Sequence, residues 1–174
     1  KIVKKGLNAV IVCPTGIIGP YDFFSSETGQ LIMSFINKKI HLLIHGSYDF
    51  VDVRDVVNGL LLAEEKGRTG EIYILSGTNI SLVKIKELVQ EIIGIRTPHV
   101  IFPFRLALIG AHIMKYIYNY TGQTPIFTPY SLLTVVENSL FSSEKAESEL
   151  GYSTRPIKKT IEDTIVWQKT GYSG

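Results

Sequence analysis

The fold is decided by residues 9–20, Ala9-Val-Ile-Val-Cys-Pro-Thr-Gly-Ile-Ile-Gly-Pro20. The first five of these residues are apolar without interruption, which is typical of a strand covered on both faces, as in a parallel sheet. Pro14 ends the run, and Gly16-Ile-Ile-Gly19 reads as a turn at the carboxyl end of that strand. Ligands bind at this end of open α/β sheets. The stretch therefore predicts a strand followed either by the wall of a binding site or by a plain turn.

Working outward, the sequence predicts a second strand at Glu71–Leu75 and a helix between the two strands. Asp52 is a suitable N-cap for this helix, and Lys66 and Gly67 are suitable at its end. Ser81 can cap a further helix. The expected apolar face of the first helix is Val53, Val56, Val57, Leu60 and Leu61, and that of the second is Leu82, Ile85, Leu88, Val89, Ile92 and Ile93. Alternating strands and helices predict an α/β layer.

Two features suggest that more chain precedes residue 1. Two parallel strands cannot form a stable sheet alone, because their outer backbone groups need partners. Lys1-Ile-Val-Lys-Lys-Gly6 also reads as the end of a helix, with cations near the negative helix terminus and a glycine cap. We therefore expect a C-terminal part of a longer protein. A residual purification tag is the alternative for the first residues.

The C-terminal part of the sequence predicts further helices. Phe104–Tyr120 is apolar and aromatic, but its polar interruptions make it too short to span a membrane, so we expect a packed helix. Ser142 or Ser143 can cap a short helix that ends at Gly151. Pro156 can open a last helix that runs to about Lys169.

Composition excludes several classes of protein. The chain has 174 residues, 45% of them hydrophobic, and a net charge of +2, which is too small for a nucleic-acid surface. A single cysteine, Cys13, excludes a disulfide framework and a cysteine-rich zinc site, and it favours a cytoplasmic location. We expect Cys13 to be an inert residue of a buried strand. The four histidines are scattered and predict no metal site.

The segment Gly46–Val57, G-S-Y-D-F-V-D-V-R-D-V-V, is a second candidate for function. In one interpretation Asp52 and Asp55 stabilise the start of a helix, and Arg54 is their local counter-ion. In the other, Tyr48 and Asp49 line a pocket. The sequence has no Gly-x-Gly-x-x-Gly fingerprint, no Walker loop and no Gly-x-Ser-x-Gly nucleophile elbow.

Several motifs, in order along almost the whole chain, resemble one family. They are Pro14-Thr-Gly-Ile-Ile-Gly-Pro20, Asp49-Phe-Val-Asp-Val-Arg-Asp-Val-Val57, Glu64–Gly77 with Asn79–Leu82, and Phe141–Tyr152. The chain resembles the second half of an extended short-chain dehydrogenase/reductase of the NAD-dependent epimerase/dehydratase family. The most similar branch is the dihydroflavonol reductase-like one, beside sugar-epimerase-like proteins.

The resemblance implies a Rossmann-type parallel sheet without its N-terminal dinucleotide-binding half, plus a mainly helical substrate-binding region. We assign residues 1–97 to the sheet part and 98–174 to the helical part. NAD or NADP is the implied cofactor. The implied cofactor contacts are Pro14, Thr15, Gly16, Ile17 and Ser26, and the implied substrate contacts are Asp22, Thr28 and Tyr48.

Two departures limit what this chain can do alone. The catalytic Tyr-x-x-x-Lys of the family is absent, so we expect the chain by itself to be inactive and to bind the cofactor poorly. Tyr48 stands where nucleotide-sugar epimerases carry a phosphate-binding arginine, which favours a ring-bearing or apolar carbonyl or alcohol substrate.

Two functions remain as alternatives to this oxidoreductase: a nucleotide-sugar epimerase, and a non-catalytic dinucleotide-sensing or association module. The expected partners are a small-molecule substrate and the missing N-terminal half of the same protein, with a homodimer left open. A nucleic acid is not expected, and a membrane is disfavoured.

Overall fold

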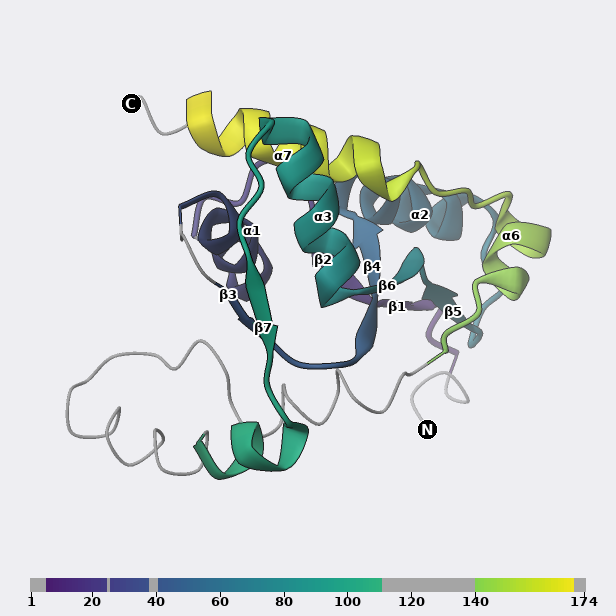
Figure 1. The fold of residues 1–174 in the computed structure, drawn as a ribbon. Coiled ribbons are helices and arrows are strands. Elements are labelled where there is room, and N and C mark those ends of the chain that lie inside the picture. The colour runs from purple at the N-terminus through teal and green to yellow at the C-terminus, as the bar shows by residue number, and fades with distance from the viewer. Residues whose placement is uncertain (1–5, 25, 38–40, 111–139, 171–174) are drawn as a thin grey trace. The chain divides into compact units, whose positions relative to one another are not determined.

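The computed structural model describes residues 6–24, 26–37, 41–110 and 140–170 (Figure 1). The chain forms two compact units. Unit 1 comprises Lys1–Phe24, Asp49–Asn79 and Leu140–Gly174, and unit 2 comprises Ser25–Tyr48 and Ile80–Ser139. These units are defined by compactness and not by role, so the expected division of function at residue 97 stays a prediction.

Unit 1 contains the predicted parallel strand pair. Strand β1 (Ile11–Pro14) pairs with β5 (Ile72–Leu75) in a register that runs from Ile11 opposite Ile72 to Pro14 opposite Leu75. Helix α2 (Val53–Lys66) lies between these strands in the sequence, as a parallel pair requires. The expected α/β class is confirmed.

The predicted caps of α2 are correct, but its predicted inner face is partly wrong. The Asp52 side chain accepts a hydrogen bond from the backbone N–H of Arg54, and Gly67 follows the last turn. The buried side of α2 carries Val56, Gly59 and Ala63. Val57, Leu60 and Leu61 are instead about half exposed. Gly59 determines which side of α2 faces the sheet. A Cβ there would lie 2.5 Å from Leu75 Cδ1, so the absence of a side chain lets the helix pack closely on β5 along this side.

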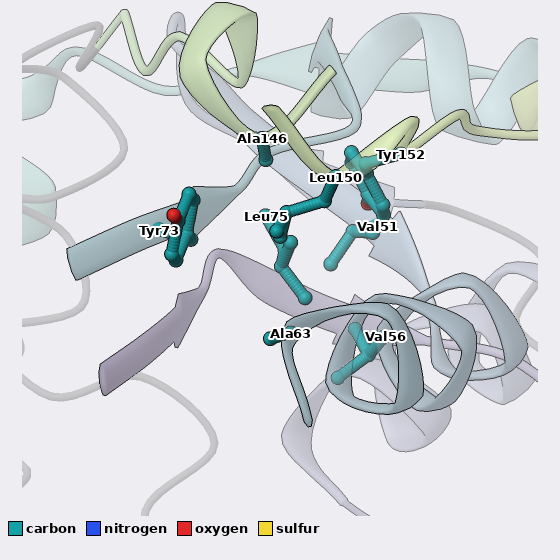
Figure 2. Close-up of a cluster of buried hydrophobic side chains, with 8 residues drawn as sticks. All are labelled: Val51, Val56, Ala63, Tyr73, Leu75, Ala146, Leu150 and Tyr152. Atoms are coloured by element: carbon teal, nitrogen blue, oxygen red, sulfur yellow. The ribbon is translucent and has the colours of Figure 1, made fainter. Parts of the chain in front are cut away.

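The core of unit 1 joins segments that are far apart in the sequence (Figure 2). Helix α6 (Glu144–Leu150) ends at Gly151, whose φ of 76° suits a glycine cap. The cluster consists of Val51, Val56, Ala63, Tyr73, Leu75, Ala146, Leu150 and Tyr152. The C-terminal part of the chain therefore completes the core around β5 and α2.

One face of the β1–β5 pair remains bare among the residues that the structure describes. Ile11, Ile72 and Ile74 are 50%, 51% and 37% exposed, and Cys13 on the same face is also exposed. The expectations of a strand covered on both faces and of a buried Cys13 are therefore wrong for this chain. The opposite face of β5 is buried, with Tyr73 and Leu75 in the core.

Three short strands form a second sheet in the order β2-β4-β6. Strand β2 (Gly16–Ile18) pairs in parallel with β4 (Ser47–Asp52), and β6 (Thr78–Ser81) is the third strand. The predicted turn at Gly16–Gly19 is thus largely a strand. The chain passes between the two units within β4 and again within β6.

Unit 2 contains helices α1 (Glu27–Asn37) and α3 (Leu82–Ile93), which pack on each other, and the parallel pair β3 (His41–Leu43) and β7 (His99–Ile101). The predicted N-cap of α3 is present at Ser81, and Gly94, which was not predicted, forms its C-cap. Residues 104–110 are helical, and the remainder of the helix predicted to reach Tyr120 lies outside the described residues.

A buried polar chain in unit 2 has no counterpart in the sequence prediction. The Lys86 amine, 2% exposed, donates to the Thr97 carbonyl oxygen at 2.6 Å and to Gln90 Oε1 at 3.2 Å. Gln90 Nε2 donates to Thr97 Oγ1, which also contacts the buried His41 ring. Burial lowers the pKa of Lys86. These hydrogen bonds satisfy polar groups that would otherwise be costly to bury.

Charged groups connect α2 with helix α7 (Ile157–Thr170) in unit 1. The Arg54 guanidinium donates to Asp52 Oδ2 at 2.7 Å and to Asp163 Oδ2 at 2.8 Å. Asp55 instead accepts from the backbone and side chain of Arg155, both at 2.8 Å. The interpretation of Arg54 as the counter-ion of both Asp52 and Asp55 is therefore wrong for Asp55.

These contacts predict a loss of stability in acid. Burial opposes the ionisation of Asp52, but hydrogen bonds from Arg54 outweigh it and hold the pKa of Asp52 below its ordinary value. An unfolded aspartate, with a pKa of about 3.9, takes up its proton first as the pH falls. We therefore expect the full contribution of Asp52 above about pH 4 and its progressive loss below that value in urea denaturation.

The substitution Arg54→Met should lower the free energy of unfolding at pH 7 by about 3 kcal/mol, because it leaves the buried Asp52 without its main partner. It should also flatten the acid dependence. Lys84→Met, which removes the exposed pair of Lys84 with Glu87, is the control. Equal effects of the two substitutions would contradict this account.

Candidate functional site

The candidate site lies at the carboxyl ends of β1 and β5. Pro14 and Leu75 are paired in the register, and the Thr15 backbone N–H donates to the Leu75 carbonyl oxygen at 3.2 Å. The segment Pro14–Ile17 therefore runs along the edge where ligands bind in open α/β sheets. It lies beside Ser76 and Gly77, which directly follow β5.

A buried carboxylate holds this edge together. Asp49 is 3% exposed, and its Oδ1 accepts hydrogen bonds from Thr15 Oγ1 at 2.6 Å and from the Gly77 backbone N–H at 2.8 Å. A Cβ at Gly77 would lie 2.1 Å from the Phe50 carbonyl oxygen, so the chain approaches β4 closely there. Asp49 thus joins the segments that follow β1 and β5 to β4.

This geometry gives two of the residues considered above a structural role. The Thr15 hydroxyl, an implied cofactor contact, is used inside the protein as a donor to Asp49. Asp49, considered as a pocket residue in one interpretation, is a buried structural residue. Sequence reasoning missed this link because the two residues are 34 positions apart.

The outer side of the segment is apolar. Pro14 is exposed, and Ile17 is 42% exposed on β2. Ile18, Gly19 and Pro20 are buried. The exposed residues of this segment offer an apolar surface and no charged group.

An aromatic group follows the carboxyl end of β2. Tyr21 is the one described residue other than glycine with a positive φ, 72°, and Asp22 after it is half buried. The rings of Tyr21 and Phe23 contact Trp167 of α7 edge-on, at centroid distances of 6.2 and 5.3 Å. Trp167 was not predicted, because no motif connects it with residues 21–23.

The remaining predicted contacts lie in unit 2. Ser26 Oγ accepts a hydrogen bond from the Gly29 backbone N–H at 3.1 Å, which caps the start of α1. Thr28 is half buried in the first turn of α1, and Tyr48 is half buried on β4. The structure thus groups Pro14, Thr15, Gly16, Ile17 and Asp22 in unit 1 and Ser26, Thr28 and Tyr48 in unit 2. Their roles as cofactor or substrate contacts stay predictions.

The described residues contain no group of three or more histidine, cysteine, aspartate or glutamate side chains placed to hold a metal ion. Asp52, Asp55 and Asp163 of unit 1 instead pair with arginine and lysine side chains. The burial of Tyr152, whose hydroxyl donates to the Ser76 carbonyl oxygen, raises its pKa. Tyr152 is therefore a structural residue beneath the candidate site.

Comparisons with known proteins agree with the motifs. Residues 2–76 match the model of the NAD dependent epimerase/dehydratase family. A "Putative dihydroflavonol 4-reductase" of Synechocystis is 31% identical over 97% of this chain and 51% of its own length. "Sterol demethylase protein B" of Methylococcus capsulatus is 30% identical over 94% of this chain and 50% of its own length. The resemblance predicted from the sequence is confirmed.

The crystal structure of gox2253 is similar with a TM-score of 0.75 and 33% identity. The match covers 98% of this chain and 52% of that structure. This chain spans about half the length of the curated relatives that it matches.

The hydrogen bond from Thr15 to Asp49 should stabilise unit 1. We expect Thr15→Val, which keeps the shape but removes the donor, to lower the free energy of unfolding by about 1–3 kcal/mol, because Asp49 loses a partner while it remains buried. Thr15→Ser keeps the donor and should cost less. Urea denaturation measures both values, and equal losses would show that the hydroxyl is not the source of the stability.

Proposed function

We propose that this chain, which belongs to the NAD dependent epimerase/dehydratase family, forms the substrate-side part of an NAD(P)-dependent oxidoreductase that acts on a carbonyl or alcohol group. The observation that carries the proposal is the Pro14–Ile17 segment. It lies at the carboxyl edge of the sheet, and Asp49 holds it there. The whole protein would perform the reaction, and this chain would supply one wall of the site.

The chain's own residues would bind and orient the nicotinamide end of the cofactor. When bound, NAD(P)H supplies a hydride to a carbonyl carbon, and a proton reaches the carbonyl oxygen. Pro14 and Ile17 would cover one side of the ring and exclude water from it. The link of Thr15 to Asp49 would keep the backbone in position. Gly16 and Ser26 complete the proposed contacts.

The substrate would be a ring-bearing, largely apolar compound. Tyr48 would contact it with a rigid aromatic surface, and Asp22 and Thr28 would provide polar contacts. Two relatives have names that refer to a dihydroflavonol and to a sterol. Both support this substrate class over a nucleotide sugar.

The activity test uses a chimaera in which the unmatched half of the Synechocystis relative precedes this chain. We expect the chimaera to oxidise NADH or NADPH in the presence of a ring-bearing ketone. The 174-residue chain alone should not, because no tyrosine in it is followed by lysine four positions later. Absorbance of the reduced nicotinamide measures the reaction.

A variant of the chimaera tests the proposed wall. Ile17→Glu places a charge on the apolar surface and should raise the KM for the cofactor by at least about tenfold. Val166→Glu is the matched control, since Val166 is also exposed and apolar in unit 1. Dinucleotide binding without turnover would favour the sensing module, and turnover of a nucleotide sugar alone would favour the epimerase.

We also propose that the missing half of the protein covers the bare face of β1 and β5. Ile11, Ile72 and Ile74 leave an apolar sheet surface that water solvates poorly. Within the described residues, β1 pairs with β5 alone, so its other edge can accept a further strand. The half-length matches to the relatives supply a partner of suitable size.

The single cysteine provides a direct test of this cover. Cys13 is exposed on the bare face, so its thiol should react readily with a maleimide in the chain alone. In the chimaera the reaction should be at least about tenfold slower, because the covered thiol then reacts only when the structure around Cys13 opens locally. Mass spectrometry of the Cys13 peptide follows the rate. Equal rates in the chain and the chimaera would exclude the proposed cover.

A further inference from the structure

The segment that follows β2 is strained and turns sharply. Tyr21 has a φ of 72°, a left-handed backbone conformation that costs energy for a residue with a bulky side chain. The Phe23 backbone N–H donates to the Tyr21 carbonyl oxygen at 3.0 Å, which closes a tight turn with Asp22 at its centre. We call Tyr21–Phe23 the strained turn. Strain of this kind persists only where the surrounding structure enforces it, and it is concentrated at functional sites.

The rings of the strained turn are held by α7 and not by burial. Tyr21 and Phe23 are 62% and 66% exposed, so the hydrophobic effect contributes little to their placement. Both rings contact Trp167 edge-on, with the Phe23 ring centroid only 5.3 Å from that of the indole. Aromatic pairs of this geometry attract each other beyond the area that they bury. A helix near the C-terminal end of the chain therefore holds a turn near its beginning.

Helix α7 is in turn fixed to the start of α2. Asp163 lies one helical turn before Trp167 on the same side of α7, and it accepts a hydrogen bond from the Arg54 guanidinium at 2.8 Å. The chain that enters the strained turn passes close to the same end of α2, since a Cβ at Gly19 would lie 2.6 Å from Val53 Cγ1. All these residues belong to unit 1. The start of α2 thus anchors both the strained turn and the helix that holds its rings.

The strained turn is continuous with the proposed cofactor wall. Pro14–Ile17 leads through buried residues 18–20 directly to Tyr21. The residue steps from Ile17 to Tyr21 span at most about 14 Å. A substrate carbonyl must approach the nicotinamide to about 3–3.5 Å for hydride transfer. A substrate with several rings can therefore react at the wall and still reach the strained turn, whereas a substrate with a single ring is too short.

We propose that Trp167 is a positioning residue of the substrate site, which holds the strained turn so that Asp22 meets the distal part of a substrate with several rings. The inference rests on the proposed function, in which Asp22 is a substrate contact beside the wall formed by Pro14–Ile17. Trp167 acts through Tyr21 and Phe23 and touches no reacting atom.

The ring contacts can be measured in the 174-residue chain, because Trp167 is its single tryptophan. The pair Tyr21→Ala with Phe23→Ala should move the fluorescence emission to longer wavelength and ease quenching by acrylamide, since water then reaches the indole. Phe24→Ala is the matched control, because this neighbouring ring is 97% exposed and its loss should change neither property. Emission that the paired substitution leaves unchanged would overturn the proposal.

The positioning role is tested in the chimaera with two ketones of different length. Trp167→Leu should raise the KM for flavanone, a ketone with several rings, at least about fivefold, because both aromatic pairs are lost. The KM for acetophenone, which has a single ring, the KM for the cofactor and kcat should stay within about twofold. Trp167→Phe keeps an aromatic ring and should restore most of the affinity for flavanone. Val166→Ala, at an exposed residue on another side of α7, is the control.

The outcomes separate this inference from the proposed function. A chimaera that reduces neither ketone would contradict the proposed function and this inference with it. An active chimaera in which Trp167→Leu leaves the KM for flavanone unchanged, or raises it equally for both ketones, would overturn this inference alone. Circular dichroism melting checks folding. If Trp167→Leu does not fold, Phe23→Leu removes the closer ring contact from the other side, and the same comparison of the two ketones decides.

Discussion

The candidate site depends on one buried carboxylate. A carboxylate at 3% exposure is tolerated only where donors replace the water that it has lost. Asp49 receives those donors from Thr15, after β1, and from Gly77, after β5. It therefore couples its own strand, β4, to two segments that the sheet alone would leave as free ends. The position of the segment Pro14–Ile17 is therefore fixed by the need to satisfy a polar group buried beneath it.

Local patterns predicted much of the fold. The bounds of α2, α6 and α7 and the start of α3 followed from cap residues, and the strand pair β1–β5 followed from apolar runs. These features depend on neighbours within a few positions, which a single sequence displays directly. The contacts that build the site do not depend on near neighbours in the sequence. Asp49 meets Thr15 across 34 positions, and Trp167 meets Tyr21 across most of the chain, so neither contact leaves a periodic pattern.

The errors in the prediction have a common physical origin. Apolar residues were assigned to the inside, yet Val57, Leu60, Leu61 and the β1 face are exposed in this chain, while Lys86 and Gln90 are buried. Residue type predicts burial only when the surface that each element packs against is known. The relatives of this chain are about twice as long as the chain itself. The surface that would pack against these exposed apolar side chains can therefore not be read from the 174 residues. The buried lysine depends instead on the Thr97 carbonyl, a backbone acceptor that no side-chain pattern reveals.

Net charge is a poor guide to what this protein can bind. The value of +2 is the sum of two different parts. Residues 92–136 carry three basic and no acidic residues, a charge of +3, and the rest carries 15 basic and 16 acidic residues, a charge of −1. In unit 1 the carboxylates of Asp52, Asp55 and Asp163 are paired with arginine or lysine side chains, so part of the charge is neutralised inside the structure. Arg96 and Arg105 belong instead to the stretch that has no acidic residue of its own, so the net charge of the whole chain hides a local excess of positive charge.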